Sequence, residues 1–367
     1  MCIVLLTTAH PDYALIAIDN RDEFVLRPTS RPHWWNQPAP SPALPGISLN
    51  RAEATGGTIV KENAVYSSRD LYRREKGTWL GITRCGLFAV LTNFREPAAD
   101  TAVAGTRSRG GMVKAWLGGL PDEEGGSVMG GVRRLVEDGE GVKNVGGFSM
   151  VCARLRRRTC EGGEGVAIVS NRSEKTDDVP LIAQKRGGFW GLSNAVYSET
   201  EEEEWPKVTI GKRLLREAIT EAVEKQESKK ELVERLFEVL NEDTLPAMGQ
   251  DIPVLERMKT LRQSVFIPPL GDEENHQEVV RDMKEKLSQG LKEVNSSREV
   301  EEKKEEVIEK NGFDRGMYGT QRQTVVLVDW EGKVTFVERA LWDEWGTKVD
   351  KRKGDVVEEF VIEGWSD

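Results

Sequence analysis

Short apolar runs separated by turn residues dominate the first twenty positions of the chain. Residues 2–8 and 13–19 are rich in isoleucine, valine, leucine and alanine, and the stretch Ala9-His10-Pro11-Asp12 separates them. Because proline cannot donate to a strand ladder, this stretch is typical of a turn, and the pattern predicts a β-hairpin. In an antiparallel pair folded about position 11, residues whose numbers sum to roughly 22 face each other. The segment near residue 20 should therefore return beside residue 2.

Further strand-like runs occur in both halves of the chain, with amphipathic helical patterns between them. The apolar runs predict strands at 57–60, 79–83, 86–92, 148–155, 165–170, 189–193, 323–329 and 334–338. The helical patterns cover 109–118, 127–137, 207–224 and 229–240. A capping box, Ser228-x-x-Glu231, precedes the last of these helices. This distribution predicts an α+β fold in which helices cover two packed antiparallel sheets.

The segment 271–310 differs from the rest of the chain in composition. It is dense in glutamate and lysine and contains few large apolar residues. Because such a segment can bury little apolar surface, we interpret it as a charged insertion, helical or disordered, within a single domain that spans residues 1–367.

Charge and cysteine content exclude several classes of function. The chain has 52 lysines and arginines against 62 aspartates and glutamates, so its net charge of -10 gives no attraction to nucleic acid. The four cysteines form no CxxC motif, which argues against a disulfide scaffold or a structural zinc site. Three scattered histidines are a poor metal-ligand set. We therefore expect neither a nucleic-acid partner nor a metal site.

Apolar stretches are too short for a membrane segment. None approaches the roughly 20 residues that span a bilayer, and the first residues lack the basic and long apolar regions of a secretory signal. With so few cysteines, the chain is typical of a reducing compartment. We expect a cytoplasmic protein without a transmembrane segment, in contact with organelles from outside.

The cysteine at position 2 is the first candidate for chemistry. If Met1 is removed, the thiol and the free α-amino group belong to one residue. An α-amino pKa of about 8 lies close to a thiol pKa of about 8.5, so the amine can act as the base of its own nucleophile. The structural alternative is a small apolar residue on a buried strand. A Cys2–His10 pair stays open as a further alternative.

Polar residues at strand ends complete the candidate set. The predicted hairpin returns Asn20-Arg21-Asp22-Glu23 beside Cys2, where Asp22 and Arg21 can make charge-assisted hydrogen bonds to the amine and the thiolate. The alternative is a polar turn with a local ion pair. Asn93 and Asn194 also stand at strand ends, where an amide can stabilise an oxyanion or simply form a turn.

Cofactor signals are weak. No GxxxxGK[ST] motif occurs, so nucleotide binding by that route has no support. Haem has Cys2, His10 or a methionine as candidate axial ligands, although their spacing forms no recognisable pattern. The residues by themselves therefore require no cofactor.

Seven motifs along the chain resemble the transport and Golgi organisation family, also called the NRDE family after its tetrapeptide. They are Met1-Cys2, Asn20-Arg21-Asp22-Glu23, GTWLGI at 77–82, LTNFRE at 91–96, SRGGMV at 108–113, GLSNA at 191–195 with WPKV after it, and YGTQRQTVVLVDWEGKVTFVER at 318–339. They occur in the order of the family. One departure follows YGT, where the family usually has arginine and small hydroxyl residues and this chain has Gln321-Arg322-Gln323.

The resemblance implies a four-layer αββα sandwich of the N-terminal nucleophile hydrolase type. It also implies roles for site residues. In cysteine amidases of that fold, a terminal thiol attacks an amide, an aspartate holds the amine, an arginine lies nearby and an asparagine lines the oxyanion hole. Carried over by position, the catalytic set is Cys2, Asp22, Arg21, Asn194 and Asn93. The ligand-binding set is Asn20, Arg21, Asp22 and Glu23.

Two functions follow from the resemblance. The family is linked to Golgi and endoplasmic-reticulum organisation, to lipid and acyl-coenzyme A homeostasis and to haem movement. The first hypothesis is a trafficking or homeostasis protein that binds a lipid-type ligand, acyl-coenzyme A or haem, with a Golgi or mitochondrial association. The alternative is a cysteine amidohydrolase or thioesterase-like enzyme that uses Cys2 as its nucleophile.

Overall fold

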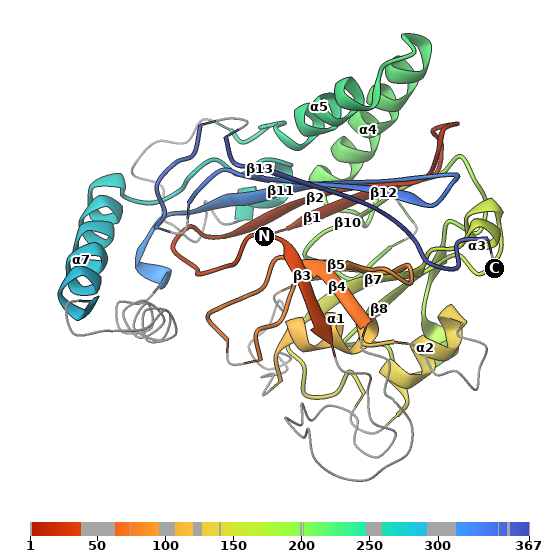
Figure 1. The fold of residues 1–367 in the computed structure, drawn as a ribbon, viewed down its shortest axis with the longest axis horizontal. Coiled ribbons are helices and arrows are strands. Elements are labelled where there is room, and N and C mark those ends of the chain that lie inside the picture. The colour runs from red at the N-terminus through yellow and green to blue at the C-terminus, as the bar shows by residue number, and fades with distance from the viewer. Residues whose placement is uncertain are drawn as a thin grey trace.

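Two antiparallel sheets form the centre of the protein in its computed structural model (Figure 1). The structure describes residues 2–37, 63–73, 75–94, 107–119, 127–138, 141–198, 200, 202–246, 259–291, 313–343, 345–350 and 353–366. The six-stranded sheet has the order β10-β1-β2-β11-β12-β13, and the seven-stranded sheet has the order β3-β4-β5-β6-β7-β8-β9. Both ends of the chain therefore contribute to the same sheet.

The strands of the six-stranded sheet are β10 (Phe189–Leu192), β1 (Ile3–Thr7), β2 (Tyr13–Phe24), β11 (Tyr318–Asp329), β12 (Lys333–Ala340) and β13 (Asp355–Val361). Those of the seven-stranded sheet are β3 (His33–Gln37), β4 (Asn63–Ser67), β5 (Leu80–Thr83), β6 (Leu87–Asn93), β7 (Phe148–Arg154), β8 (Val166–Ser170) and β9 (Leu181–Ile182). The α-helices are α1 (Arg109–Leu117), α2 (Val128–Val136), α3 (Arg157–Glu161), α4 (Pro206–Glu224), α5 (Lys229–Leu240) and α7 (Glu273–Leu291). Short 3₁₀ helices are η2 (Thr176–Asp178), η3 (Leu261–Gln263) and η4 (Phe313–Arg315).

The hairpin expected at the start of the chain is β1–β2. Ile3 pairs with Asn20 and Val4 with Asp19, so the paired numbers sum to 23, one more than expected. Because the strands are antiparallel, the end of β2 lies beside the residue that precedes β1. This register confirms that the charged tetrapeptide returns to Cys2.

The side chains of each strand point alternately to the two faces of its sheet, so the buried core is divided into three layers. Between the sheets, Val4 and Val326 pack with Phe88 and Val151 in one buried cluster. On the outer face of the six-stranded sheet, Leu5 packs with residues of α4 and α5. These opposite directions follow from the period of two in a strand, which sends adjacent side chains to opposite faces.

Helices α1 and α2 cover the outer face of the other sheet. Trp116 of α1 and Val132 of α2 pack with Leu91 and Met150 in a third buried cluster. Figure 1 shows α4 and α5 on one side of the two sheets and α1 and α2 on the other. The order helix, sheet, sheet, helix confirms the predicted four-layer αββα architecture.

Several elements carried no clear sequence signal. No pattern in the sequence predicts α3, β3, β4, β9 or the edge strand β13. Strand β13 has the sequence DVVEEFV, in which the adjacent glutamates Glu358 and Glu359 interrupt the apolar pattern. An edge strand tolerates such charged residues because one of its sides meets solvent. The expected strand at 57–60 lies outside the described residues.

The charged segment begins as a helix that packs along one stripe. Helix α7 buries Val279, Val280 and Met283 against Leu26, although most of its other residues are exposed. His276 fixes its first turn, because Nδ1 accepts from the Met317 N–H at 3.3 Å and Nε2 lies 2.7 Å from the Gly346 oxygen. Residues 273–291 of this segment are thus helical, while the rest of 271–310 lies largely outside the described residues. Across the described ranges, no helix is both long and apolar enough to cross a membrane.

The predicted capping box at α5 is present. The Ser228 hydroxyl accepts from the backbone N–H of Glu231, and the Glu231 carboxylate accepts from the backbone N–H of Ser228 at 2.8 Å. We expect Ser228→Ala to lower the free energy of unfolding by about 1 kcal/mol, because a helix donor loses its partner. Urea denaturation measures this change. Ser228→Asp, which can still cap, should stay close to the wild type.

Candidate functional site

Cys2 lies buried at the entrance to β1. Its side chain exposes 4% of its surface, and its Sγ lies 3.9 Å from the backbone oxygen of Asp22. Removal from water raises the pKa of the thiol to about 12. The thiol is therefore protonated at neutral pH in this arrangement.

Asp22 and Lys207 form an ion pair beside Cys2 that is closed off from water. Lys207, near the start of α4, is completely buried, and its Nζ lies 3.8 Å from Asp22 Oδ2. The hydroxyl of Thr320 donates to Asp22 Oδ1 at 2.7 Å. Burial raises the pKa of Asp22 and lowers the pKa of Lys207, and the attraction between the two charges opposes both shifts.

Asp19 and Arg21 add two more buried charges on the same strand. Burial raises the pKa of Asp19 to about 8, against the opposing effect of Arg21. The Arg21 guanidinium donates to Thr29 at 3.1 Å and to Gln321 at 3.0 Å, and it stacks 4.9 Å above the Trp79 ring. At neutral pH Asp19 is thus a protonated acid next to a fixed cation.

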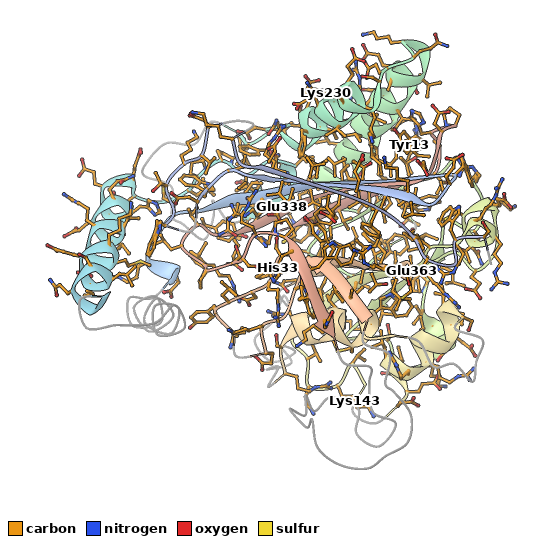
Figure 2. The ribbon with its side chains drawn as sticks, viewed as in Figure 1. Tyr13, His33, Lys143, Lys230, Glu338 and Glu363 are labelled. Atoms are coloured by element: carbon orange, nitrogen blue, oxygen red, sulfur yellow. The ribbon has the colours of Figure 1, made fainter. Side chains whose placement is uncertain are left out.

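Arg322 and Glu338 add two further buried charges on the neighbouring strands. Arg322 of β11 pairs with Arg21 of β2. Arg322 Nε lies 3.7 Å from Glu338 Oε1, and burial lowers the pKa of Arg322 to about 9. Figure 2 labels Glu338 near the middle of the molecule. We call six side chains that each expose 5% or less of their surface the buried charged cluster: Asp19, Arg21, Asp22, Lys207, Arg322 and Glu338.

A bulge in β11 shapes this cluster. Thr320 pairs with Asp22 while Arg322 pairs with Arg21, so Gln321 is the extra residue. Bulges turn side chains away from the regular alternation and are common beside functional sites. The Gln321 amide accepts from Arg21 and donates to Val25 and Arg27 oxygens, so this departure from the family pattern still contacts the tetrapeptide strand.

Asn194 and Asn93 come together at the same end of the sheets. The Ser193 hydroxyl donates to the Cys2 backbone oxygen at 2.7 Å and lies 3.2 Å from Asn194 Oδ1. The Asn194 amide donates to the Asn93 backbone oxygen. The fold thus connects both asparagines to Cys2 through Ser193, while the oxyanion role stays a prediction.

Asn20 and Glu23 make contacts within the protein on either side of the site. Asn20 donates to the backbone oxygens of Leu240 and Val265 at 2.8 and 2.9 Å, so its amide ties β2 to the end of α5. Glu23 accepts from Arg27 at 3.2 Å. The ligand-binding role of both residues stays a prediction. The hydrogen bonds of Asn20 hold the end of α5 against the strand that carries the site.

His10 lies far from Cys2. It follows β1, and the five residues of this strand rise by about 3.4 Å each, which separates the two side chains by the length of the strand. Its Nδ1 accepts from the Asp12 N–H at 3.1 Å within the hairpin turn. A Cys2–His10 pair, left open by the sequence, is therefore wrong. Within the described ranges, no group of three or more acidic, histidine or cysteine side chains could hold a metal ion.

Two pockets lie away from this site. The larger, about 320 Å³, is lined by the edge strands β9 and β10, by Tyr197 and by the Glu204–Lys212 ion pair of 2.7 Å. The smaller, about 20 Å³, lies near Thr8 and Cys160. Neither of them is lined by Cys2 or by a member of the buried charged cluster.

Sequence reasoning missed Lys207, Asp19, Ser193 and Glu338. For Lys207 a signal existed: it shares the buried stripe of α4 with Gly211 and Leu215 at a spacing of four. A lysine on an apolar stripe of a helix is costly unless it has a buried partner. For Glu338, the pairing with Arg322 depends on the register of β11 and β12, which the sequence does not display.

Comparisons with known proteins match the chain over most of its length. The family model described as Transport and Golgi organisation 2 matches residues 1–59 and 48–343. The Homo sapiens protein named Transport and Golgi organization protein 2 homolog is 27% identical over 334 residues, which cover 90% of this chain and 88% of that protein. A Saccharomyces cerevisiae protein described as uncharacterized is 23% identical over 349 residues, 93% of this chain and 92% of the relative.

Among solved structures, the C2A mutant of the conjugated bile acid hydrolase from Clostridium perfringens is similar at 11% identity. The match covers 100% of this chain and 98% of that one, with a TM-score of 0.35, which is too low to support an inference about the site. Family membership rests on the family model, which covers far more than half of the chain. The protein described here belongs to the Transport and Golgi organisation 2 family.

Proposed function

We propose that this protein acts in transport and Golgi organisation by binding a lipid-type ligand, an acyl-coenzyme A or haem, whose polar group reaches the buried charged cluster. The observation that carries the proposal is Lys207. Its ammonium is completely buried, lies 3.8 Å from Asp22 and makes no hydrogen bond to any described residue. An oxygen of a ligand would supply the acceptor that this ammonium lacks.

The free-energy cost of burying charged groups supports a functional role for the buried charged cluster. Charged groups lose several kcal/mol of hydration when they are buried, and apolar residues of similar size often give equal or greater stability. The three cations and three carboxyl groups of the cluster balance when all of them are ionised, and burial raises the pKa of Asp19 to about 8. Wherever Asp19 holds its proton the cations are in excess, and an anionic or strongly polar group, such as a carboxylate, suits them.

The state of the thiol is compatible with binding without turnover. With Met1 in place before Cys2, burial raises the pKa of the thiol to about 12, so almost no thiolate, the nucleophilic form, is present at neutral pH. A carrier needs no such nucleophile. The Trp79 ring, packed against Arg21, offers an apolar surface next to the charged groups.

A cysteine amidohydrolase or thioesterase is the second candidate, favoured by the hydrogen bonds that join Cys2, Ser193 and Asn194. It requires Cys2 to be the first residue. The free amine would then take the thiol proton as sulfur bonds to the substrate carbonyl carbon. The amine would return that proton to the leaving amine or thiol as the C–N or C–S bond breaks. Water would release the acyl group from Cys2 in a second step.

Titration of palmitoyl-coenzyme A and of haem into two variants tests the proposal. We expect Asp22→Ala to weaken binding by about tenfold, because Asp22 is the ion-pair partner that positions the Lys207 ammonium, 3.8 Å away, for the ligand oxygen. Cys2→Ser, which keeps the shape of the side chain, should bind nearly as the wild type does. Equal loss in both variants, with melting temperatures unchanged, would contradict a carrier and favour catalysis.

Intact mass before and after brief treatment with a thiol-reactive ester separates the two candidates. A carrier predicts little labelling of Cys2 over this time. Loss of Met1 together with rapid, single-site acylation of Cys2 would establish a nucleophile and support the hydrolase.

A further inference from the structure

One edge strand of each sheet lines the larger of the two pockets. Within the described residues, β10 pairs only with β1, and β9 pairs only with β8. The chain runs from β9 to β10 through residues 183–188, so it crosses here from the seven-stranded sheet to the six-stranded sheet. Leu181 and Ile182 of β9 and Phe189 and Trp190 of β10 all line this pocket, which we call the edge pocket. Two strands that each lack a partner on one side thus meet at one cavity.

The edge pocket passes along the free edge of β10. Phe189 and Trp190 are adjacent in the strand, so their side chains point to opposite faces of the sheet. Phe189 packs with the buried cluster beneath α4 and α5, whereas Trp190 packs with the cluster between the two sheets. Because β1 occupies the other edge of β10, a pocket lined by both side chains has to pass the free edge of the strand.

The free edge of β10 carries backbone groups that point away from β1. The Thr8 N–H donates to the Gly188 oxygen at 3.3 Å, so these two residues form a hydrogen-bonded pair of the antiparallel ladder. Such pairs recur at every second residue, and the backbone groups of Trp190 therefore also point toward β1. Those of Phe189 and Gly191 point to the free edge, where no described residue forms a hydrogen bond with them. Two donors and two acceptors thus stand there at the spacing of a strand.

The other walls of the edge pocket combine aromatic rings with polar groups. The rings of Trp190 and Tyr197 pack against the core between the sheets and stay partly exposed. Glu204 and Lys212 form an ion pair of 2.7 Å, and their side chains expose only 8% and 15% of their surface. Most of the surface that faces the pocket is polar. The pocket therefore suits a ligand that combines hydrogen-bonding groups with a flat apolar side chain.

We propose that the edge pocket binds an extended peptide segment of a partner protein, which pairs with β10 and places an aromatic side chain against Trp190 and Tyr197. In strand addition of this kind, main-chain hydrogen bonds supply affinity and a side-chain pocket supplies specificity. A cavity of about 320 Å³ is small for a ligand site, so it suits one large side chain with the amide groups on either side of it. Phe189 pairs with Thr7, at the end of β1 remote from Cys2, so this site goes beyond the proposed function.

Calorimetric titration of the peptide acetyl-Lys-Thr-Phe-Thr-Thr-Lys-amide into the full chain at physiological ionic strength tests the pairing. In a paired strand, the N–H groups of alternate residues point to the same neighbour. We therefore expect N-methylation of one alternate set of peptide residues to weaken binding at least about tenfold, and N-methylation of the other set to change it by no more than about twofold. Equal weakening by the two methylation patterns, or no binding of the unmethylated peptide, would overturn the proposal.

Two variants at position 189 separate backbone pairing from the loss of a side chain. Phe189→Ala and Phe189→Pro both remove the ring, whose centre lies 5.0 Å from the Arg216 guanidinium carbon, but only proline also removes the N–H that points to the free edge. An edge strand tolerates proline where its N–H faces outward. We expect the peptide to bind Phe189→Pro at least about tenfold more weakly than Phe189→Ala. Equal affinities at matched melting temperatures would contradict strand pairing.

Tyr197→Ala tests the aromatic wall without a change in the strand. This variant should bind the phenylalanine peptide about fivefold more weakly than the wild type, and should bind the same peptide with alanine in place of phenylalanine as the wild type does. An equal effect on both peptides would show that the aromatic side chain does not enter the edge pocket. Asp22→Ala, which tests the proposed function, leaves β10 intact, so peptide binding to that variant should be unchanged whether or not the proposed function holds.

Discussion

Replacing Lys207 with methionine is expected to lower the free energy of unfolding by about 3–5 kcal/mol at pH 7, the usual cost of removing one partner of a buried ion pair. Methionine fits the apolar stripe of α4, so packing changes little. Asp22 loses the charge 3.8 Å away while its carboxylate stays buried. The destabilisation therefore comes from electrostatics and not from a cavity.

A double-mutant cycle in urea denaturation measures this effect. In Lys207→Met/Asp22→Asn, both charges are removed and the amide oxygen can still accept from Thr320, which donates to Asp22 Oδ1 in the wild type. We expect the double variant to recover most of the stability lost in the single variant. A double variant as unstable as Lys207→Met alone would show that the lysine contributes through packing instead.

Asp19→Asn is expected to stabilise the protein progressively as pH rises. In the folded state burial raises the pKa of Asp19 to about 8, from an ordinary value of 3.8. Between these values the folded wild type holds a proton that the unfolded chain releases, so the wild type loses stability with increasing pH. Asparagine has no proton to lose. The advantage of the variant should therefore grow by at most about 1.4 kcal/mol per pH unit from pH 4 to about pH 8, and then remain constant.

Urea denaturation at one-unit steps from pH 5 to pH 9 measures the difference between Asp19→Asn and the wild type. Asp350→Asn, which removes the same charge from an exposed side chain, serves as the control for net charge. A difference between Asp19→Asn and the wild type that does not change with pH would contradict the assignment of a protonated Asp19 at neutral pH.

Much of the fold can be predicted from the sequence, because the apolar periodicity that marks strands and helices is a local signal. The expected segments agree to within a few residues with strands β1, β5, β6, β7, β8 and β10, and with helices α1, α2, α4 and α5. For β2, β11 and β12 the expected segments cover only a part of each strand. The β1–β2 pairing also follows from the turn at 9–12 to within one residue, since a short turn sets which residues face each other. Strand β13 and helix α3 escape this reasoning because their residues are charged or few, and their place depends on the neighbours they pack against.

Local sequence signals predict only part of the candidate site. Cys2, Arg21 and Asp22 are close in the hairpin, so their proximity follows from local pairing. Lys207, the ion-pair partner of Asp22, lies on a helix that is 185 positions further along the chain (207 − 22 = 185). Its position in the apolar stripe shows that it is buried, but not which carboxylate it meets.

The sequence by itself determined the layer architecture and the return of the charged tetrapeptide to Cys2, because side-chain periodicity and short turns act between neighbours in the chain. Only the tertiary structure decided the charge state of the site. The pKa values of Cys2 and Asp19 depend on how completely water is removed, and this depends on packing of both sheets and of α4 around them. Electrostatics and solvent exclusion act through space, and for that reason they are set by the assembled fold.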